Sequence, residues 1–315
     1  MTGSRILALG HYQPSRVVTN DDLAKLVDTN DEWIRDRVGI ASRRIADAGE
    51  TVADMAAAAA GKALANSGLT AADIDLVVVA TCTSVDRSPN VACRVAGKLG
   101  ISAPGAYDIN TACSGFAYAL GTVDHAIRAG AARNAIVVGA EKLSDFTDWT
   151  DRSTCIIFGD GAGAAVVTAT AEGEPAGIGP VVWGSVPEKS DAVRIEGWRP
   201  YIAQEGQAVF RWATTALAPL ARQACERAGI DPSELAAFVP HQANSRIIDG
   251  IAKRLDIPQA IIAKDIVESG NTSAASVPLA LSKLVERREV PSGAPVLLFG
   301  FGGGLTYAGQ VVRCP

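Results

Sequence analysis

The sequence lacks the features that would place the chain in a membrane or outside the cell. No apolar stretch approaches the roughly 18 residues that suggest a membrane-spanning helix. The first residues, MTGSRILALGHYQPSR, have no charged region followed by a long apolar run, so we expect no secretory signal peptide. Only three histidines and six cysteines are present, and the cysteines form no C-x-x-C pair. We therefore expect a cytoplasmic protein with no metal site and no disulfide framework.

An excess of positive charge is also missing. The 29 lysines and arginines are outnumbered by 34 acidic residues, which gives a net charge of −5 and a pI of about 5.3. We therefore expect neither a nucleic-acid nor a membrane-surface partner. Apolar residues, by contrast, make up 48% of the 315 residues, which is enough for a large core in one or two domains.

The chain contains an internal repeat. Residues 68–74 and the β-branched run 77–80 return 161 positions later, without a gap, as residues 229–235 and 238–241. We further pair residues 108–109 and the helix after them with residues 265–266 and a helix over 276–287, and a strand over 135–139 with one over 295–300. The Gly- and Pro-rich segment 173–180 separates the copies, which assigns residues 1–172 to one half and 178–315 to the other.

Predicted strands and helices alternate within each copy, as in the alanine-rich helix over 51–66 that ends before Gly68. This alternation predicts an α/β fold in which each half is a parallel or mixed sheet covered by helices. Functional residues in such sheets collect beyond the carboxyl ends of the strands. If the halves pack about a pseudo-twofold axis, the turn at Cys113 and the turn near Asn271 approach each other.

Cys113 lies between a predicted strand that ends at Ile109 and a predicted helix over 114–129. The unpaired N–H groups at a helix N-terminus favour a thiolate, so we expect a lowered pKa for this thiol. Buried free cysteines without a chemical role are much commoner than nucleophiles. The residues that accompany Cys113 must therefore decide its function.

Two further strand-end loops offer groups that suit acyl chemistry. His241 follows a strand of the second half, and Asn271 lies in the turn 270–276. The glycine run 302–304 comes directly after the last core strand, where backbone N–H groups can approach a reacting oxygen. Each residue alone is usually structural, but their occurrence at matching positions of a duplicated fold favours a catalytic site.

Two other interpretations fit less well. The segment 159–164, GDGAGA, satisfies a relaxed dinucleotide fingerprint, but the residues after it read as a strand and not as the required helix. The order Cys, His, Asn is also that of papain-like proteases. Their local cysteine signature, signal peptide and disulfides are missing here, and their folds are not duplicated.

The sequence resembles the β-ketoacyl-ACP synthase III family, the CoA-primed condensing enzymes of type II fatty-acid synthesis in the thiolase-like superfamily (ACP, acyl carrier protein). The resemblance runs nearly end to end through DTNDEWIRDRVGI, DINTACSGF, IIFGDGAGAAVV, VPHQANSRIID, GNTSAASVPLAL and GFGGGLTYAG. Asn271 is informative because the elongating synthases I and II carry a second histidine in that role. The segments WGS and QEGQAVFRWA are similar to those of actinobacterial members. A five-layer α-β-α-β-α arrangement is implied.

The resemblance implies a decarboxylative condensation without a metal or redox cofactor. Cys113 attacks an acyl-CoA and holds the acyl group as a thioester. His241 and Asn271 donate hydrogen bonds to the malonyl-ACP thioester as its carboxylate leaves. The N–H groups of Cys113 and Gly303 hold the tetrahedral oxyanion. The alternatives are an acyltransferase that no longer condenses and a starter-unit enzyme of a specialised polyketide pathway.

The resemblance also implies sites for both substrates. Trp33 is expected to stack on the CoA adenine with Arg152 on its other face, and the remaining CoA contacts are expected from Arg37 and Asn244. An independent pattern concerns the carrier protein. In the predicted helix 244–255, apolar residues form one stripe, and the opposite side carries Arg246, Lys253 and Arg254. Because acyl carrier proteins are acidic, we expect this basic face to dock ACP.

The acyl pocket is expected to be lined by Phe158 and closed by a loop of the partner subunit in a homodimer. The family's loop corresponds to residues 83–90, and acetyl-specific relatives have phenylalanine before its proline. Ser88 takes that place here, so we expect room for a longer or branched acyl chain. The segment 185–204, which helps to cover the pocket, is shorter than expected for actinobacterial members.

Overall fold

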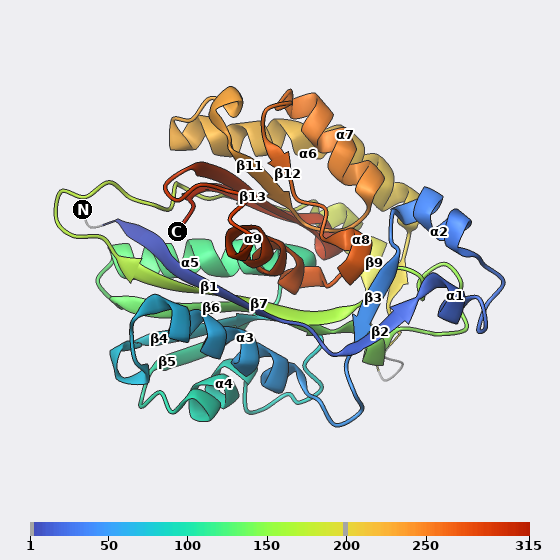
Figure 1. Ribbon diagram of the computed structural model, residues 1–315, viewed down its shortest axis with the longest axis horizontal. Coiled ribbons are helices and arrows are strands. Elements are labelled where there is room, and N and C mark those ends of the chain that lie inside the picture. The colour runs from blue at the N-terminus through green and yellow to red at the C-terminus, as the bar shows by residue number, and fades with distance from the viewer. Residues whose placement is uncertain (1–2, 198–200) are drawn as a thin grey trace.

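Two five-stranded mixed sheets are stacked with helices between them and on both outer faces (Figure 1). The computed structural model describes residues 3–197 and 201–315. The first sheet has the order β1-β7-β6-β4-β5 and comprises β1 (Ser4–Tyr12), β4 (Leu76–Ala80), β5 (Gly105–Ile109), β6 (Asn134–Lys142) and β7 (Asp160–Ala169). The second has the order β12-β11-β13-β14-β8 and comprises β8 (Val182–Gly184), β11 (Ala237–Pro240), β12 (Ile261–Ile262), β13 (Pro295–Gly302) and β14 (Thr306–Arg313).

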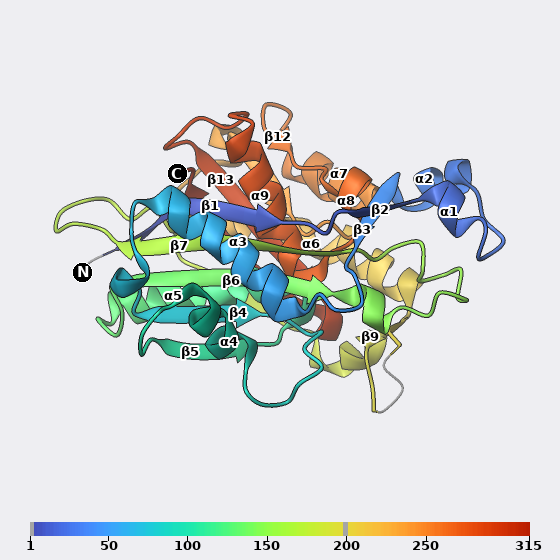
Figure 2. The same cartoon turned by 60° about the horizontal axis from the view of Figure 1, so that its bottom comes forward.

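The helices form three layers. Helices α3 (Val52–Ser67) and α4 (Val91–Leu99) cover the outer face of the first sheet, with β5 at its edge (Figure 2). Helices α5 (Gly115–Arg128) and α9 (Ser276–Glu286) lie between the sheets, and α6 (Gly206–Ala228) and α7 (Ser245–Leu255) cover the second sheet (Figure 1). Smaller elements surround this core: β2 (Arg16–Thr19) with β3 (Ser42–Ile45), β9 (Val193–Arg194) with β10 (Ala203–Gln204), α1 (Asn20–Leu23), α2 (Asp31–Val38) and α8 (Ile266–Ser269).

Side-chain alternation along each strand explains why the sheets need cover on both faces. On β4, Val77 and Val79 pack against α3 and α4, whereas Val78 and Ala80 pack against the central helices. Such continuous apolar strands are typical of sheets that are buried on both sides. Helix α3 begins at the N-cap Thr51 and ends at Gly68 in the left-handed conformation, close to the predicted 51–66. Among the described residues, no helix is long and apolar enough to cross a membrane.

The predicted duplication is present in the structure with its spacing of 161 residues. It relates β6 to β13, the 3-10 turn η1 (Ala71–Asp73) to η5 (Pro232–Glu234), and the start of α5 to the start of α9. One predicted pairing is wrong. The counterpart of β5 is β12, since each is the parallel edge strand beside β4 or β11. Because β12 has only two residues, the chain leaves the sheet early, and Ile266 begins helix α8 where Ile109 ends a strand.

All of the segment GDGAGA except its first glycine lies within β7, which runs antiparallel to both β1 and β6. A dinucleotide fingerprint needs a helix to begin at this position so that its N-terminus can hold the pyrophosphate. The interpretation of these glycines as a strand is therefore confirmed.

Candidate active site

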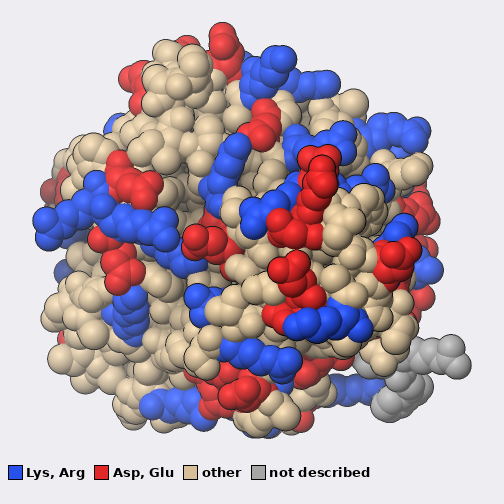
Figure 3. All heavy atoms as spheres, turned by 45° about the vertical axis from the view of Figure 1, so that its right-hand side comes forward, with Lys and Arg blue, Asp and Glu red and all other residues tan. Residues whose placement is uncertain are grey.

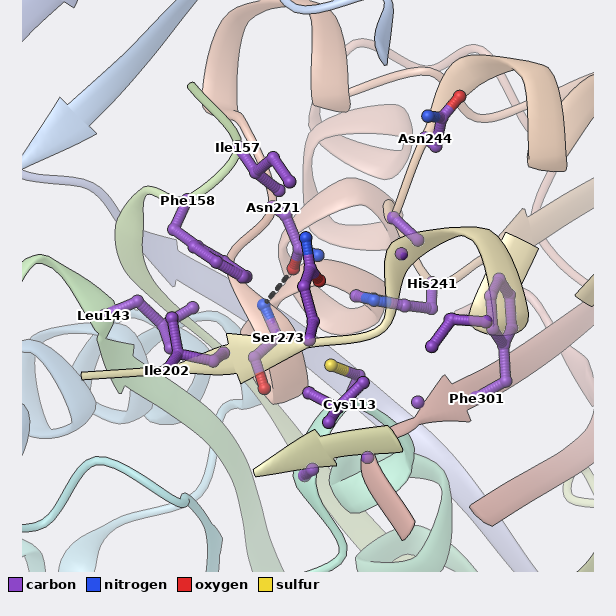
Figure 4. A pocket seen from close by; sticks show the side chains of 18 of the residues that line it. Cys113, Leu143, Ile157, Phe158, Ile202, His241, Asn244, Asn271, Ser273 and Phe301 are labelled. Carbon is purple, nitrogen blue, oxygen red and sulfur yellow. Dashed lines mark hydrogen bonds between the residues drawn. The ribbon is translucent and has the colours of Figure 1, made fainter. Parts of the chain in front are cut away.

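A single cavity of about 1260 Å³ collects the predicted catalytic residues from both halves. Cys113 enters it from the turn η2 (Ala112–Ser114), which joins β5 to α5. His241 follows β11 directly, and Asn271 precedes the turn η6 (Ser273–Ala275). In Figure 4 these three side chains face the same space. The turns η2 and η6 are in contact, as the duplication predicted.

The expectation of a lowered pKa for Cys113 is wrong. Burial raises the pKa of this thiol to about 11, and the Glu141 charge adds to the shift. The contact with Ser273 and the N–H groups of Gly303 and Cys113 only partly oppose it. The sequence argument considered the local helix end, but Gly302, Gly303 and Ser273 of the other half also lie against the sulfur. The resting nucleophile is therefore a thiol at neutral pH.

A glycine run gives the thiol both space and backbone donors. A Cβ on Gly302 would lie 2.5 Å from the Cβ and 2.8 Å from the Sγ of Cys113, which is too close for non-bonded atoms. Gly303 lines the cavity, and its N–H and that of Cys113 both hydrogen bond towards the sulfur. Two N–H groups at one reacting atom are the arrangement that holds an oxyanion.

His241 is held as a neutral hydrogen-bond donor. Burial lowers the pKa of its imidazole to about 3, and the edge of the Phe301 ring packs against it with the ring centres 5.2 Å apart. Its Nδ1 lies 2.7 Å from Ser276 Oγ, which also accepts the Gln242 N–H at 3.3 Å. Ser276 can therefore give its own proton to Nδ1. We assign the proton to Nε2 from this network, which leaves that N–H for a ligand.

The carboxamide of Asn271 is oriented by the backbone. Its Oδ1 accepts the Ser273 N–H at 2.8 Å, the contact drawn in Figure 4, so the NH₂ group is left to donate into the cavity. Its own N–H donates to Ile157 O at 2.9 Å, and its carbonyl accepts the Gly159 N–H at 3.0 Å. These contacts fix the position of the side chain before any ligand binds.

The residues expected to contact CoA gather at the mouth of the cavity. Trp33 and Arg37 come from α2, and the guanidinium carbon of Arg152 lies 4.9 Å from the centre of the indole ring. Because Arg152 already covers one face of Trp33, an adenine between the two needs this guanidinium to move. Asn244 also lines the cavity, but its side chain caps α7 at Arg246 N (2.9 Å) and donates to Arg37 O (3.1 Å).

Helix α7 is amphipathic, as predicted. Its buried stripe consists of Ile247, Ile248, Ile251 and Leu255. Arg246, Lys253 and Arg254 are exposed, and Arg246 also lines the cavity. The sequence analysis missed Arg211, an exposed residue of α6 that lines the same cavity. Figure 3 faces the side that carries α1 and α2 and shows basic and acidic side chains interspersed. A docking face therefore depends on which cations lack an acidic partner, not on overall charge.

Of the two residues expected in the acyl pocket, only Phe158 lines the cavity of its own chain. Phe158 is 4% exposed and lines the cavity. Ser88 lies in the loop before α4 and is not among the described residues that line the cavity of its own chain. The segment 185–204 contributes Val193 and Ile202 to the cavity wall, while its residues 198–200 lie outside the described part of the chain.

The comparisons with known proteins agree with this geometry. Sequence models described as 3-oxoacyl-[acyl-carrier-protein (ACP)] synthase III and its C terminal match residues 107–187 and 225–314. The chain is 64% identical over 313 residues to β-ketoacyl-[acyl-carrier-protein] synthase III 4 of Streptomyces coelicolor, with 99% of both chains covered. The chain belongs to the β-ketoacyl-ACP synthase III family.

Other relatives of this synthase III chain extend the match. The mycobacterial β-ketoacyl-[acyl-carrier-protein] synthase III of Mycobacterium avium is 45% identical over 326 residues, covering 100% of this chain and 96% of the relative. The priming β-ketosynthase of the R1128 polyketide biosynthetic pathway has a TM-score of 0.97 at 42% identity, with 99% and 96% coverage. The synthase III of Aquifex aeolicus has a TM-score of 0.95 at 41% identity, with 99% and 100% coverage.

Family membership confirms the thiolase-like fold, the actinobacterial resemblance and the assignment as a condensing acyltransferase. The expected activity, condensation of an acyl-CoA primer with malonyl-ACP, is that of the synthase III family. Among the residues that the structure describes, no group of three or more His, Cys, Asp or Glu side chains could hold a metal ion.

Three polar residues beside the nucleophile were not singled out from the sequence. Glu141, near the end of β6, is fully buried and accepts hydrogen bonds from Cys82 and Ser273. Cys82 and Ser273 both line the synthase III cavity. The repeat spacing of 161 could have drawn attention to Glu141, because it aligns this residue with Gly302 of the second half.

Proposed function

We propose that this synthase III carries an acyl primer on Cys113 and condenses it with malonyl-ACP through His241 and Asn271. The observation that carries this assignment is the convergence of one thiol, two side-chain donors and two backbone donors on one cavity. In the first half-reaction, Cys113 Sγ bonds to the acyl carbon and CoA leaves as a thiol. The N–H groups of Cys113 and Gly303 stabilise the oxyanion that forms on the way.

In the second half-reaction, malonyl-ACP binds in the same cavity and loses carbon dioxide. The electron pair of the broken bond forms an enolate, whose oxygen gains negative charge. The neutral Nε2–H of His241 and the NH₂ group of Asn271 would donate to that oxygen, which lowers the barrier because they are already oriented. The enolate carbon then attacks the acyl carbon on Cys113. No electrons leave the substrates, so the proposed chemistry requires no redox cofactor. The side-chain and backbone donors would stabilise both the enolate and the oxyanion, so it requires no metal either.

CoA and ACP are the proposed partners at the mouth. Trp33, Arg37, Arg152 and Asn244 would bind CoA, since an indole suits a purine face and guanidinium groups suit phosphates. Arg246, Lys253 and Arg254 would dock the acidic carrier protein. Arg211 extends this basic region from α6.

A homodimer in the cytoplasm is the proposed working form. Among the described strands, β5 pairs on one side only, and its residues Tyr107 and Ile109 remain half-buried. Unpaired edges of this kind invite pairing with a second copy. The loop with Ser88 would then reach the partner's acyl pocket. Six free cysteines and CoA thioester substrates fit a reducing compartment.

A role in a specialised polyketide pathway is the second candidate. It is favoured by the similarity to the priming β-ketosynthase of the R1128 pathway. Products made from malonyl-ACP and a panel of acyl-CoAs, identified by mass spectrometry, distinguish this role from bulk lipid synthesis by the primer that is preferred.

The proposed function is tested by separating its two half-reactions. An acyl-CoA should add its acyl mass to the Cys113 peptide, both in the wild type and in His241→Ala. The variant should lose decarboxylation of malonyl-ACP by about 10²–10³-fold, the usual effect of removing one such donor. Label on Cys82, Cys155 or Cys225, or normal decarboxylation by His241→Ala, would overturn the assignment and favour a non-condensing acyltransferase.

A further inference from the structure

The proposed function leaves the proton of the Cys113 thiol without an acceptor. Burial raises the pKa of this thiol to about 11, so its proton must depart as the sulfur attacks. His241 is a poor base, because burial lowers its pKa to about 3. Its Nδ1 is also engaged by Ser276. Another group must therefore take the proton.

Glu141 is a buried carboxyl group whose charge acts on the Cys113 thiol, and it has no assigned role. It is 0% exposed, and no ion pair joins it to any cation in the described part of the chain. Its Oε1 accepts from Ser273 Oγ at 3.0 Å and from Cys82 Sγ at 3.3 Å. Its Oε2 accepts from Thr83 Oγ1 at 2.5 Å and Thr81 Oγ1 at 3.1 Å, and the Cys82 N–H reaches both oxygens.

The hydrogen bonds around Glu141 favour its carboxylate form. Thr83 Oγ1 accepts the Lys142 N–H at 2.9 Å, and Thr81 Oγ1 accepts the Thr83 N–H at 3.2 Å. Each hydroxyl can therefore donate its own hydrogen bond to Glu141. Burial raises the pKa of Glu141, and these donors only partly oppose the shift. A buried carboxylate without a cation is a stronger base than an exposed one.

Ser273 connects this base to the nucleophile. Its hydroxyl donates to Glu141 Oε1 at 3.0 Å, and its side chain is among the groups that shift the pKa of the Cys113 thiol. Figure 4 shows Ser273 beside Cys113, with its backbone tied to Asn271. Since the one hydroxyl proton points to the carboxylate, an oxygen lone pair is left for the thiol proton. Ser273 holds this position with a φ of +48°, which is rare for a residue other than glycine.

We propose that Ser273 and Glu141 form a proton relay that activates Cys113 for acylation, an inference that rests on the acyl-transfer step proposed above. As Cys113 Sγ bonds to the acyl carbon, its proton passes to Ser273 Oγ and the Ser273 proton passes to Glu141 Oε1. The bond from the acyl carbon to the CoA sulfur then breaks, and that sulfur keeps the electron pair. The relay runs backwards to protonate the departing CoA, which restores the Glu141 carboxylate.

Replacing Glu141 shows whether it acts as a base or only as a neighbouring negative charge, because the two roles change the acylation rate in opposite directions. The Glu141 charge raises the pKa of Cys113, so Glu141→Gln should speed acylation if charge alone matters. If Glu141 is the base, the variant should acylate about 10²-fold or more slowly at pH 7. Its rate should then rise about tenfold per pH unit as hydroxide replaces the base, whereas the wild-type rate should be flat near neutrality.

The measurement is single-turnover acylation with acetyl-, isobutyryl- and octanoyl-CoA between pH 6 and 10, followed by mass on the Cys113 peptide. The titratable groups that face the relay are Cys82, Cys113 and His241. The Lys142 ammonium group instead donates to Asp47 O at 3.1 Å. Ser273→Gly and Ser273→Ala should reproduce the pH profile of Glu141→Gln, and agreement between them excludes backbone strain as the cause. The two Ser273 variants still test the relay if Glu141→Gln does not fold.

Thr81→Val is the matched control, since it removes a donor to the far oxygen of Glu141 but keeps the carboxyl group. Its rate should therefore lack the tenfold rise per pH unit expected of Glu141→Gln. A wild-type profile in Glu141→Gln or in both Ser273 variants would overturn the relay, as would a loss of equal size at every pH. Absence of any acylation of Cys113 in the wild type would instead overturn the proposed function. The two ideas therefore fail in different ways.

Discussion

The turn that carries Cys113 and the turn that carries Ser273 have the same backbone and different chemistry. Each contains a residue with positive φ, +45° at Ala112 and +48° at Ser273, just before a central helix. In each, an asparagine two residues earlier accepts the N–H of that residue, Asn110 at 3.3 Å and Asn271 at 2.8 Å. The duplicated fold thus supplies one turn geometry twice, and the catalytic thiol occurs in only one copy.

The strand ends beneath these turns differ in a complementary way. At matching positions, β6 carries Glu141 and β13 carries Gly302. Glu141 contacts Ser273 of the other half, and Gly302 leaves room for Cys113 of the other half. Each half therefore supports the turn of its counterpart, one with a carboxylate and the other with empty space. The symmetric fold fixes positions, and asymmetric side chains decide the reaction.

The largest expected effect is a difference in decarboxylation between variants of Asn271 and Asn110. Asn271→Ala should lower decarboxylation of malonyl-ACP by about 10²–10³-fold, because a donor to the forming enolate is lost. Asn110→Ala removes the equivalent turn hydrogen bond and should cost only about 1 kcal/mol of unfolding free energy. The decarboxylation rate is measured by the release of labelled carbon dioxide, and the free energy of unfolding by urea denaturation. Equal loss of decarboxylation in both variants would mean that the turn, and not the donor, matters.

The next effect concerns the space beneath Cys113. Gly302→Ala would place a Cβ 2.5 Å from the Cβ of Cys113 and push the sulfur out of line. Misplacement of this kind costs about 10²-fold in rate, so acylation of Cys113 should fall by that factor. Gly97→Ala, at a helical glycine with nothing within 4 Å, is the control and should leave acylation intact. Normal acylation by Gly302→Ala would show that the site tolerates the methyl group.

Local sequence patterns predicted the fold better than they predicted the electrostatics of the site. The apolar runs predicted β4 to the residue and the starts of β6 and β13 to within one residue, because both copies bury the same apolar positions. The pairing of residues 108–109 with 265–266 failed, because β12 is short and leaves the sheet early. The pKa of Cys113 could not be predicted, since its burial comes from residues remote in sequence. Glu141 was missed because a single carboxyl at a strand end has no sequence relation to the serine that it contacts.

A smaller effect follows from comparing α4 with α7, which occupy equivalent places after β4 and β11. The α4 cations are paired, Arg94 with Asp86 at 2.6 Å and Lys98 with Asp54 at 2.7 Å. No ion pair is found for Arg246, Lys253 or Arg254 of α7 among the described residues. This basic face is therefore available to an acidic carrier protein.

Arg246→Gln should raise the apparent KM for malonyl-ACP about two- to fivefold at low salt and less at high salt, as expected for an exposed ion pair. Lys98→Gln on α4 removes the same charge and should leave that KM unchanged. Acyl transfer from CoA serves as the internal reference for both variants. Equal damage to CoA and ACP kinetics in Arg246→Gln would assign the arginine to CoA or to folding.

The last comparison concerns how α4 and α7 begin. Asn244 caps α7 four residues after β11 ends, whereas the first half inserts a loop before its equivalent cap, Asn90. Ser88 belongs to this extra loop, which would reach the partner's acyl pocket in a homodimer. Each methylene buried in an apolar pocket contributes about 0.8 kcal/mol, or about fourfold in kcat/KM. The wild type should therefore prefer isobutyryl- or octanoyl-CoA to acetyl-CoA, and Ser88→Phe should reverse that order by filling the space. A wild type that prefers acetyl-CoA, or an unchanged profile in Ser88→Phe, would show that the loop does not set the pocket and that its cover comes from within one chain.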